Sequence, residues 1–226
     1  MLFRSEFGTV NVDVEHFRHY FPEATFTLIS DRKHDIKGFD KKFYVYPTFK
    51  KEEDPRYGWH MNDLWQIAWM FRSEADICIA FDADVRIVSD QIRTIIPLVK
   101  RFGLCLPANG RMIVHRDATF GMDGGEVGDD SKGNGFALNT AITALDMKNR
   151  MALNCANTFC ELMQENPQRA PLIWWKAIWK TGFFPCLLPF QWCVCNDHIG
   201  CGDEILLHVG HTTVKEHYKE LISQAV

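Results

Sequence analysis

Two carboxylates follow an apolar run in the first half of the chain. Residues 77–81 (ICIAF) are apolar and mostly β-prone, and Asp82 and Asp84 come directly after them. A short apolar run bounded by polar residues is typical of a buried strand. Because side chains two positions apart in a strand point to the same face, we expect Asp82 and Asp84 to project together from its carboxyl end.

This spacing predicts a particular chemistry. Two neighbouring carboxylates repel each other unless a positive charge lies between them. A divalent cation that carries phosphate meets this need, since Mg²⁺ and Mn²⁺ take one or two carboxylates together with phosphate oxygens. Ligands of open α/β sheets also bind at the carboxyl ends of strands. The alternative is a surface strand with two solvated aspartates, which the uniformly apolar run disfavours.

The elements that must position the pair are indicated by apolar periodicity. Helical spacing and strand-like runs alternate through the first half of the chain, which predicts an α/β fold with a mainly parallel sheet. No linker or repeat interrupts the chain, so we expect one domain over residues 1–226. Helices are predicted at 12–20, 61–72, 89–101, 147–164, 171–180 and 214–223, and strands at 25–29, 43–47, 77–85, 102–106, 136–145, 184–188 and 205–208.

Composition excludes several classes of protein. The 226 residues are 46% hydrophobic and 24% charged, with a net charge of −4, which is usual for a globular chain. The absence of a long basic run disfavours a nucleic-acid partner. The sequence contains no run of about 18 uncharged apolar residues, so no transmembrane helix is predicted. The first residues are too charged for a signal peptide, so we expect a cytoplasmic protein.

The eight cysteines are expected to be mostly reduced in such a compartment. Cys193, Cys195, His198 and Cys201 lie close together in sequence, and their types suit zinc. Their spacing is tighter than that of the common two-knuckle zinc sites. A reduced loop beside the core is therefore the preferred interpretation.

Acidic pairs of this kind occur in two enzyme classes. One is the DxD motif of GT-A glycosyltransferases, and the other is the nucleophile motif of haloacid-dehalogenase-type phosphatases. In the phosphatases Asp82 would be the nucleophile and Asp84 the acid/base. That class also needs a later acidic pair after a strand, but residues 120–127 before Asp129 and Asp130 are rich in glycine and acids. Its first motif also normally lies near the start of the chain.

Four segments, in order, resemble GT-A glycosyltransferases of the glycogenin-like and galactosyltransferase-like branches. They are 58–64 (GWHMNDL), 77–88 (ICIAFDADVRIV), 135–146 (GFALNTAITALD), and 184–192 followed by 206–210 (LLHVG). The resemblance implies a single GT-A-type domain, Rossmann-like, with a smaller antiparallel portion in the C-terminal half. Two positions depart from the family pattern: Ala141 stands where a glycine is usual, and Lys215 lacks the Pro-Trp that often follows.

The resemblance also implies a metal-dependent transfer of sugar from a nucleoside-diphosphate sugar, with UDP favoured. Asp82 would reach the ribose and the metal, Asp84 would chelate the metal, and His208 would complete the site, with His211 as its rival. A histidine ligand favours Mn²⁺ over Mg²⁺, because imidazole is the softer donor. Residues expected to bind the nucleotide-sugar are Asp31, Asn62 or its neighbour Gln66, Asp82, Ala83, Asp84, Asn139 and Lys215.

The acceptor, a glycan or another hydroxyl compound, has less distinct candidates. Aromatic faces stack on sugars, so Trp174, Trp175, Trp179 and Trp192 could line a cleft or could belong to the core. The glycine-rich stretch 109–135 is a candidate lid or acceptor loop, or an insert without structure. An inverting enzyme needs a carboxylate base, for which the candidates are Asp123, Glu126, Asp129 and Asp130. A sugar- or nucleotide-binding module without turnover stays open as a third function.

Overall fold

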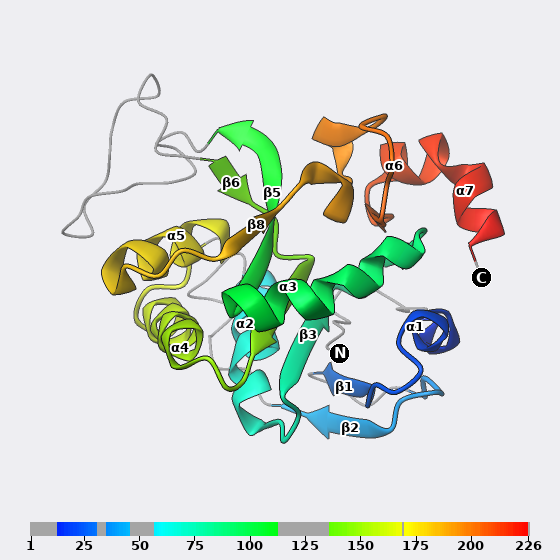
Figure 1. Cartoon of the computed structure of the whole chain (residues 1–226). Helices are drawn as coiled ribbons and strands as arrows, with labels where there is room; N and C mark the ends of the chain where they lie inside the picture. Colours follow the sequence, from blue (N-terminus) through cyan, green and yellow to red (C-terminus); the bar gives the residue numbers. More distant parts are fainter. Residues whose placement is uncertain (1–12, 31–34, 46–56, 113–135, 169, 226) are drawn as a thin grey trace.

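The computed structural model describes residues 13–30, 35–45, 57–112, 136–168 and 170–225 (Figure 1). Its main sheet has five strands: β3 (Ile77–Phe81), β7 (Ile142–Asp146), β5 (Leu104–Met112) and β6 (Phe136–Leu138) in that order, with β8 (Cys186–Leu188) paired to β5. Two further strand pairs are described, β1 (Thr27–Ser30) with β2 (Lys41–Tyr44) and β4 (Val85–Ile87) with β9 (Leu206–His208).

The α/β class is confirmed, but the strand pairing differs from the prediction. Strands β3, β5 and β8 run in one direction, whereas β6 and β7 run in the other. Because β7 lies between β3 and β5, its pairings with both are antiparallel. The described parallel pairings are β1 with β2 and β5 with β8. The antiparallel portion therefore reaches the strand that carries the acidic pair, since the returning chain inserts β7 beside it.

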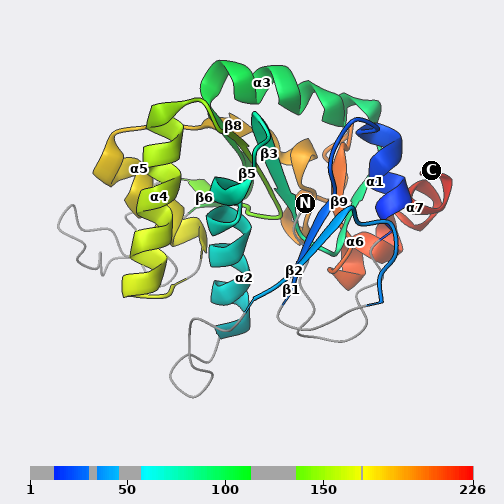
Figure 2. The ribbon, with the colours of Figure 1, turned by 90° about the horizontal axis from the view of Figure 1, so that it is seen from below.

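Helices cover both faces of the main sheet (Figure 2). On one face lie α2 (Tyr57–Ala68), α4 (Arg150–Glu165) and α5 (Ala170–Thr181), and on the other lie α1 (Val14–Tyr20) and α3 (Ile95–Phe102). Shorter helices are η1 (Met70–Arg72), η2 (Asp90–Thr94), η3 (Phe190–Trp192), η4 (Asn196–His198), α6 (Thr212–His217) and α7 (Lys219–Gln224). No helix in the described ranges has the length and apolar character needed to cross a membrane.

Alternation along the strands divides the core into two clusters. Leu104 and Leu106 of β5 pack on the side of α2, α4 and α5, whereas Cys105 packs on the side of α1 and α3. Ala80 and Phe81 of β3 divide in the same way. Each buried aliphatic or aromatic side chain contributes about 1.5–3 kcal/mol by leaving water. Burial of both faces therefore fixes β3, which leads into the acidic pair.

Local sequence sets where the elements end. Ser89 accepts a hydrogen bond from the Gln91 backbone N–H and begins η2, which continues into α3. Gly103 ends α3 at φ +83°, a left-handed conformation that favours glycine. The predicted strand 136–145 is interrupted at 139–141, because the Asn139 side chain accepts the Ala141 N–H at 2.8 Å and forms a turn.

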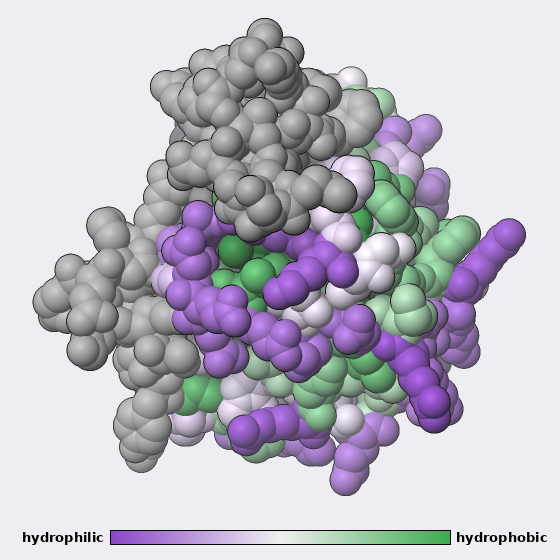
Figure 3. Space-filling view, turned by 90° about the vertical axis from the view of Figure 1, so that its left-hand side faces the viewer, coloured by the Kyte–Doolittle hydropathy of each residue, from purple (hydrophilic) through white to green (hydrophobic). Residues whose placement is uncertain are grey.

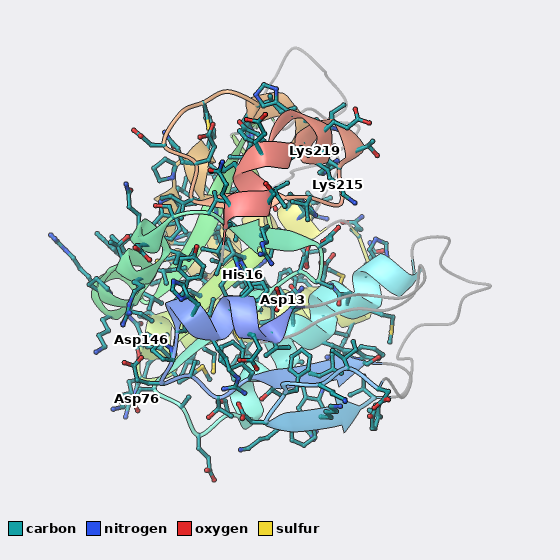
Figure 4. The ribbon with its side chains drawn as sticks, turned by 90° about the vertical axis from the view of Figure 1, so that its right-hand side faces the viewer. Asp13, His16, Asp76, Asp146, Lys215 and Lys219 are labelled. Carbon is teal, nitrogen blue, oxygen red and sulfur yellow. The ribbon has the colours of Figure 1, made fainter. Side chains whose placement is uncertain are left out.

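Helix α1 anchors the strand that follows the acidic pair. His16 Nε2 accepts the Ile87 backbone N–H of β4 at 3.1 Å. Asp13, which caps α1 through the His16 N–H, also forms a 3.2 Å ion pair with Arg86. Figure 4 labels Asp13 and His16 on and beside α1. Asp76, which directly precedes β3, is labelled apart from them, near Asp146. Residues far apart in sequence thus hold β4 in place.

Asp40 provides a test of how β1 is held. Its carboxylate accepts the Phe26 backbone N–H at 2.7 Å and the Arg18 guanidinium at 2.8 Å. The bond from Phe26 lowers the pKa of Asp40 most, with Arg18 adding to it. An unfolded aspartate has a pKa of about 3.9. The charged carboxylate therefore stabilises the fold above that value, and this contribution is lost as the pH falls through the lower folded pKa.

We expect Asp40→Asn to lower the free energy of unfolding by about 0.5–1 kcal/mol at pH 7, the value for a partly exposed charged contact. The difference from the wild type should shrink below about pH 4. Urea unfolding at a series of pH values measures both effects. Asp76→Asn is the control, because Asp76 pairs with the exposed Lys148 at the surface. A pH-independent difference would contradict the electrostatic explanation.

Candidate metal centre

Asp82, Asp84 and His208 converge where β3 ends. The strand stops at Phe81, and both aspartates lie in the turn that leads into β4, not in the strand as predicted. Strand β4 pairs with β9 so that Val85 lies opposite His208. His208 Nε2 is thereby 3.2 Å from Asp84 Oδ1, and one ligand atom from each of the three residues lies within 4.8 Å of the others.

Asp84 and His208 each favour the charged form of the other. The Asp84 side chain is 50% exposed and that of His208 is 18% exposed. Burial has the largest single effect on the pKa of His208 and lowers it, but Asp84 and Cys193 together outweigh burial, and the pKa lies well above its usual value. Burial also has the largest single effect on the pKa of Asp84 and raises it, but the hydrogen bond and charge of His208, with smaller contributions from a backbone hydrogen bond and from His211, together lower the pKa. A cation therefore already balances the acidic turn when His208 is protonated.

Asp82 is held from two sides. Gln66, which is buried on α2, donates from Nε2 to Asp82 Oδ1 at 2.6 Å. The Asp82 backbone N–H donates to Ala141 O at 2.9 Å, beside the turn that Asn139 closes. Gln66 thus orients a carboxylate, a role that sequence reasoning missed. The sequence feature that could have indicated this role is the spacing of four residues between Asn62 and Gln66, which puts both on the same helix face.

Gly210 makes room for Asp84. A Cβ atom at position 210 would overlap the Asp84 carboxylate at a distance that real Cβ contacts never show. The Gly210 N–H also donates to Asp84 O at 3.2 Å. A larger residue here would therefore force the Asp84 carboxylate to shift, and the hydrogen bond from Gly210, two residues after His208, links the end of β9 to the acidic turn.

The donor set fits a divalent cation. Two carboxylates and one imidazole are ligands of Mn²⁺, and less readily of Mg²⁺. Asp84 is half exposed, so solvent or phosphate oxygens can reach the same point. Among the residues that the structure describes, no other group of three such side chains converges.

The cysteine-rich stretch does not gather into a metal site in the described part of the chain. Cys195 Sγ lies 3.6 Å from His198 Nδ1, and the His198 ring stacks on Phe190 at 4.7 Å. All eight cysteines are free thiols.

The other residues predicted to bind the metal or the nucleotide-sugar lie near the acidic turn, at the surface, or outside the described ranges. The His211 ring packs edge-on against His208 with the centroids 4.7 Å apart, but His211 does not belong to the converging group. Ala83 lies in the acidic turn between the two aspartates, and Lys215 is exposed on α6 (Figure 4). Five predicted residues lie outside the described ranges: Asp31, Asp123, Glu126, Asp129 and Asp130.

Trp174, Trp175 and Trp192, for which the sequence left a cleft or the core open, belong to the core clusters. All three are buried, and Trp174 stacks on Phe159 inside the core at 4.3 Å. Their apolar rings gain more from the core than from solvent, because both faces of the sheet need large side chains. Trp179 is 53% exposed and packs edge-on against exposed Phe184. Figure 3 shows that hydrophilic and apolar side chains are intermixed on the side of the molecule that bears α4 and α5.

A cavity of about 900 Å³ lies along the edge of β3. It is lined by Phe26 and Ile29 near β1, by Trp69, and by β3 residues from Ile77 to Phe81. The last β3 residue that lines the cavity is Phe81, directly before Asp82, and none of the three converging side chains lines it. The cavity and the acidic turn are therefore adjacent but distinct.

No protein-family model matches the sequence, and no curated protein does. The structure resembles the WbbM bifunctional glycosyltransferase in its apo form, with a TM-score of 0.59 and 11% identity over 99% of this chain and 49% of WbbM. The chain thus spans about half of that protein.

It also resembles the galactosyltransferase LgtC in complex with donor and acceptor sugar analogues, with a TM-score of 0.54 and 9% identity over 100% of this chain and 95% of LgtC. An active-site mutant of LgtC gives a TM-score of 0.57 at 8% identity, over 98% and 94% of the two chains. Identities this low establish the fold alone. The chain has the GT-A glycosyltransferase fold.

Gln66→Leu tests the support of Asp82. Leucine keeps the volume of the buried side chain but removes the donor to Oδ1. We expect Mn²⁺ affinity, measured by calorimetry, to fall about tenfold, as for other groups that orient metal ligands. Gln91→Leu, at an exposed position of η2, is the control. Equal affinity of the Gln66 variant and the wild type would rule out this orienting role.

Gly210→Ala tests the steric requirement beside Asp84. The added methyl must displace the carboxylate, so we expect at least about a tenfold loss of Mn²⁺ affinity. Thr212→Ala, an exposed change at the first residue of α6, should leave affinity within about twofold of the wild type. Calorimetry measures both, and circular dichroism checks that each variant is folded. An unaffected Gly210 variant would show that Asp84 does not need this position.

Proposed function

We propose that the chain is a metal-dependent glycosyltransferase that moves a sugar from a nucleoside-diphosphate sugar, preferably a UDP-sugar, to a hydroxyl of a glycan or similar acceptor. The observation that supports this most is the convergence of Asp82, Asp84 and His208 at the carboxyl end of β3. The same group on an unrelated fold would suggest only a cation site. On a glycosyltransferase fold it lies at a strand end, where α/β sheets bind ligands.

The three converging residues have distinct roles in this proposal. Asp84 and His208 hold the cation, and Asp82, oriented by Gln66, reaches both the cation and the ribose. Bound Mn²⁺ or Mg²⁺ supplies Lewis-acid stabilisation of the negative charge on the departing nucleoside diphosphate. His208 must give up its proton before it can ligate, and its raised pKa makes binding favour neutral to alkaline solution.

Other residues complete the donor site. Asn62 lies one turn before Gln66 on α2 and presents an amide toward the nucleotide. Asn139 closes the turn whose carbonyl, Ala141 O, holds the Asp82 backbone. Exposed Lys215 on α6 supplies a positive charge to the diphosphate, and Ala83 leaves space beside the sugar.

The acceptor side of the proposal rests on fewer observations. The LgtC structure that this chain resembles holds donor and acceptor sugar analogues, so a sugar acceptor is the natural proposal here. Trp179, half exposed beside Phe184, is the described aromatic surface suited to stacking on a sugar ring. The base candidates remain Asp123, Glu126, Asp129 and Asp130.

Two other functions could use the same acidic pair. The glycosyltransferase fold disfavours a haloacid-dehalogenase-type phosphatase, whose second acidic pair would have to come from Asp129 and Asp130. A binding module would have the same site but no turnover. The experiment below separates all three, because each predicts a different combination of ligand binding and product release.

We expect UDP to raise the melting temperature of the protein when Mn²⁺ is present and to have little effect without it. A ligand at about 100 times its Kd adds about 2.7 kcal/mol to the free energy of unfolding. Asp84→Ala should abolish the shift, whereas Asp76→Ala, at the other end of β3, should retain it. Release of UDP from a panel of UDP-sugars then measures turnover.

Three outcomes would contradict the proposal. Stabilisation by UDP that does not need metal would remove the role of the acidic turn. Metal-dependent binding without UDP release from any donor would indicate a binding module. Release of phosphate from simple esters, lost in Asp82→Asn, would indicate the phosphatase.

A further inference from the structure

Two strand edges face the cavity beside β3. In the described part of the chain, β3 pairs with β7 alone and β1 pairs with β2 alone, so β1 and β3 belong to separate sheets. Residues of both strands nevertheless line the same cavity of about 900 Å³. Figure 1 shows β1 and β2 beside β3. The cavity therefore lies between the edges of two sheets.

The backbone of β3 presents alternate residues to this cavity. At the end of the antiparallel ladder with β7, the Asp82 N–H donates to Ala141 O at 2.9 Å. Because the direction of backbone groups alternates along a strand, the even-numbered residues of β3 bond to β7 and the odd-numbered residues face the other edge. The odd-numbered residues are Ile77, Ile79 and Phe81, and all three line the cavity.

Strand β1 presents a matching edge from the other side. The Phe26 carbonyl accepts the Lys41 N–H at 3.2 Å, and the Ser30 carbonyl accepts the Val45 N–H at 2.9 Å, so even-numbered residues face β2. The backbone groups of Thr27 and Ile29 face away from β2, and both residues line the cavity. Within the described ranges, the groups on these two edges form no further backbone hydrogen bond.

The side chains around the cavity come from both core clusters. Ile29 and Met70 belong to the cluster on the side of α2, whereas Phe26 and Phe81 belong to the cluster on the side of α1. An occupant must therefore offer apolar groups to both sides of the sheet and hydrogen bonds within it. An aliphatic chain would leave the backbone groups unpaired. An extended peptide meets both needs, because its side chains alternate while its backbone pairs with strand edges.

The exposed rim of the cavity carries unbalanced charge. Lys41 and Arg72 are exposed cations of the rim, and neither forms an ion pair among the described residues. Of the two acids there, Glu23 lies 4.0 Å from Arg93, which leaves Glu74 beside the two cations. A negative charge at the end of the occupant would balance the remaining positive charge.

We propose that this cavity is a docking slot for an extended peptide segment of another polypeptide. The segment has about five consecutive apolar residues, as a strand buried on both faces requires, and an acidic residue at the rim. Its length matches the five residues of β3. The residues of this chain outside the described ranges contain no run of five apolar residues, so the segment is supplied by another polypeptide.

The bound segment joins β1 to β3 in one continuous sheet. It covers the open edge of the strand that leads directly into Asp82, so docking stabilises the strand that positions the acidic turn. The proposal does not depend on the glycosyltransferase activity, because it rests on backbone groups and on a cavity that the three converging side chains do not line.

The first experiment uses a fluorescein-labelled peptide of five alternating valines and isoleucines, with two aspartates at each end, in anisotropy titrations of the whole chain. We expect binding that weakens at least about tenfold when alternate apolar residues of the peptide are N-methylated, since methylation removes the donors and keeps the side chains. Arg72→Glu should weaken binding about threefold or more. Lys100→Glu, an exposed change on α3 outside the cavity lining, should stay within about twofold.

The second experiment follows amide hydrogen exchange by NMR. In the protein alone, the Ile77 and Ile79 amides should exchange rapidly, whereas the Cys78 and Ala80 amides, which face β7, should be protected. The alternation along one strand thus supplies its own control. The aspartate-flanked peptide should slow exchange at Ile77 and Ile79, and the N-methylated peptide should not.

Four results would overturn the proposal. Protection of Ile77 and Ile79 in the protein alone, equal to that of Cys78 and Ala80, would show that this chain already covers the edge. Protection that grows with protein concentration would assign the docking slot to a second copy. Equal affinity for the methylated and unmethylated peptides would exclude backbone pairing. Absence of binding at about 1 mM peptide would exclude a specific site for such a segment.

Discussion

Electrostatic repulsion between Asp82 and Asp84 is the constraint around which this structure is arranged. Two carboxylates in one turn need a positive partner, and His208 provides it from a strand more than a hundred residues later in the chain. The pairing of β4 with β9 makes this possible, because it places His208 opposite Val85. The imidazole can be a cation beside the carboxylates or, once deprotonated, can join them around a metal. One ladder of backbone hydrogen bonds thus serves both states.

The rest of the fold makes that turn rigid. Strand β3 is packed on both faces, by α2, α4 and α5 on one side and by α1 and α3 on the other. Gln66 reaches Asp82 from the first of these layers, while His16 holds β4 from the second. Gly210 and Ala141 contribute backbone contacts without side chains that would crowd the carboxylates. The charged groups are consequently positioned before any ligand arrives, which reduces the ordering cost of binding.

Similarity to WbbM and LgtC at 8–11% identity shows how little of this architecture depends on particular core residues. Many combinations of apolar side chains can fill a two-sided sheet at the required volume. In this chain the residues of the candidate site are set by local features: two acidic residues directly after β3, a histidine at the end of β9, and a glycine two residues later.

Local pattern alone was sufficient to single out Asp82 and Asp84 and to place most helices and strands, because apolar runs and their polar ends are short-range features. His208 was added by the resemblance to GT-A glycosyltransferases. The tertiary structure decided the rest. It broke 136–145 into two strands, inserted β7 beside β3, and moved the aspartates from the strand into a turn. It also buried Trp174, and it brought Gln66 within 2.6 Å of Asp82. These outcomes depend on which segments, distant in sequence, pack against one another. Local sequence periodicity does not specify such long-range contacts.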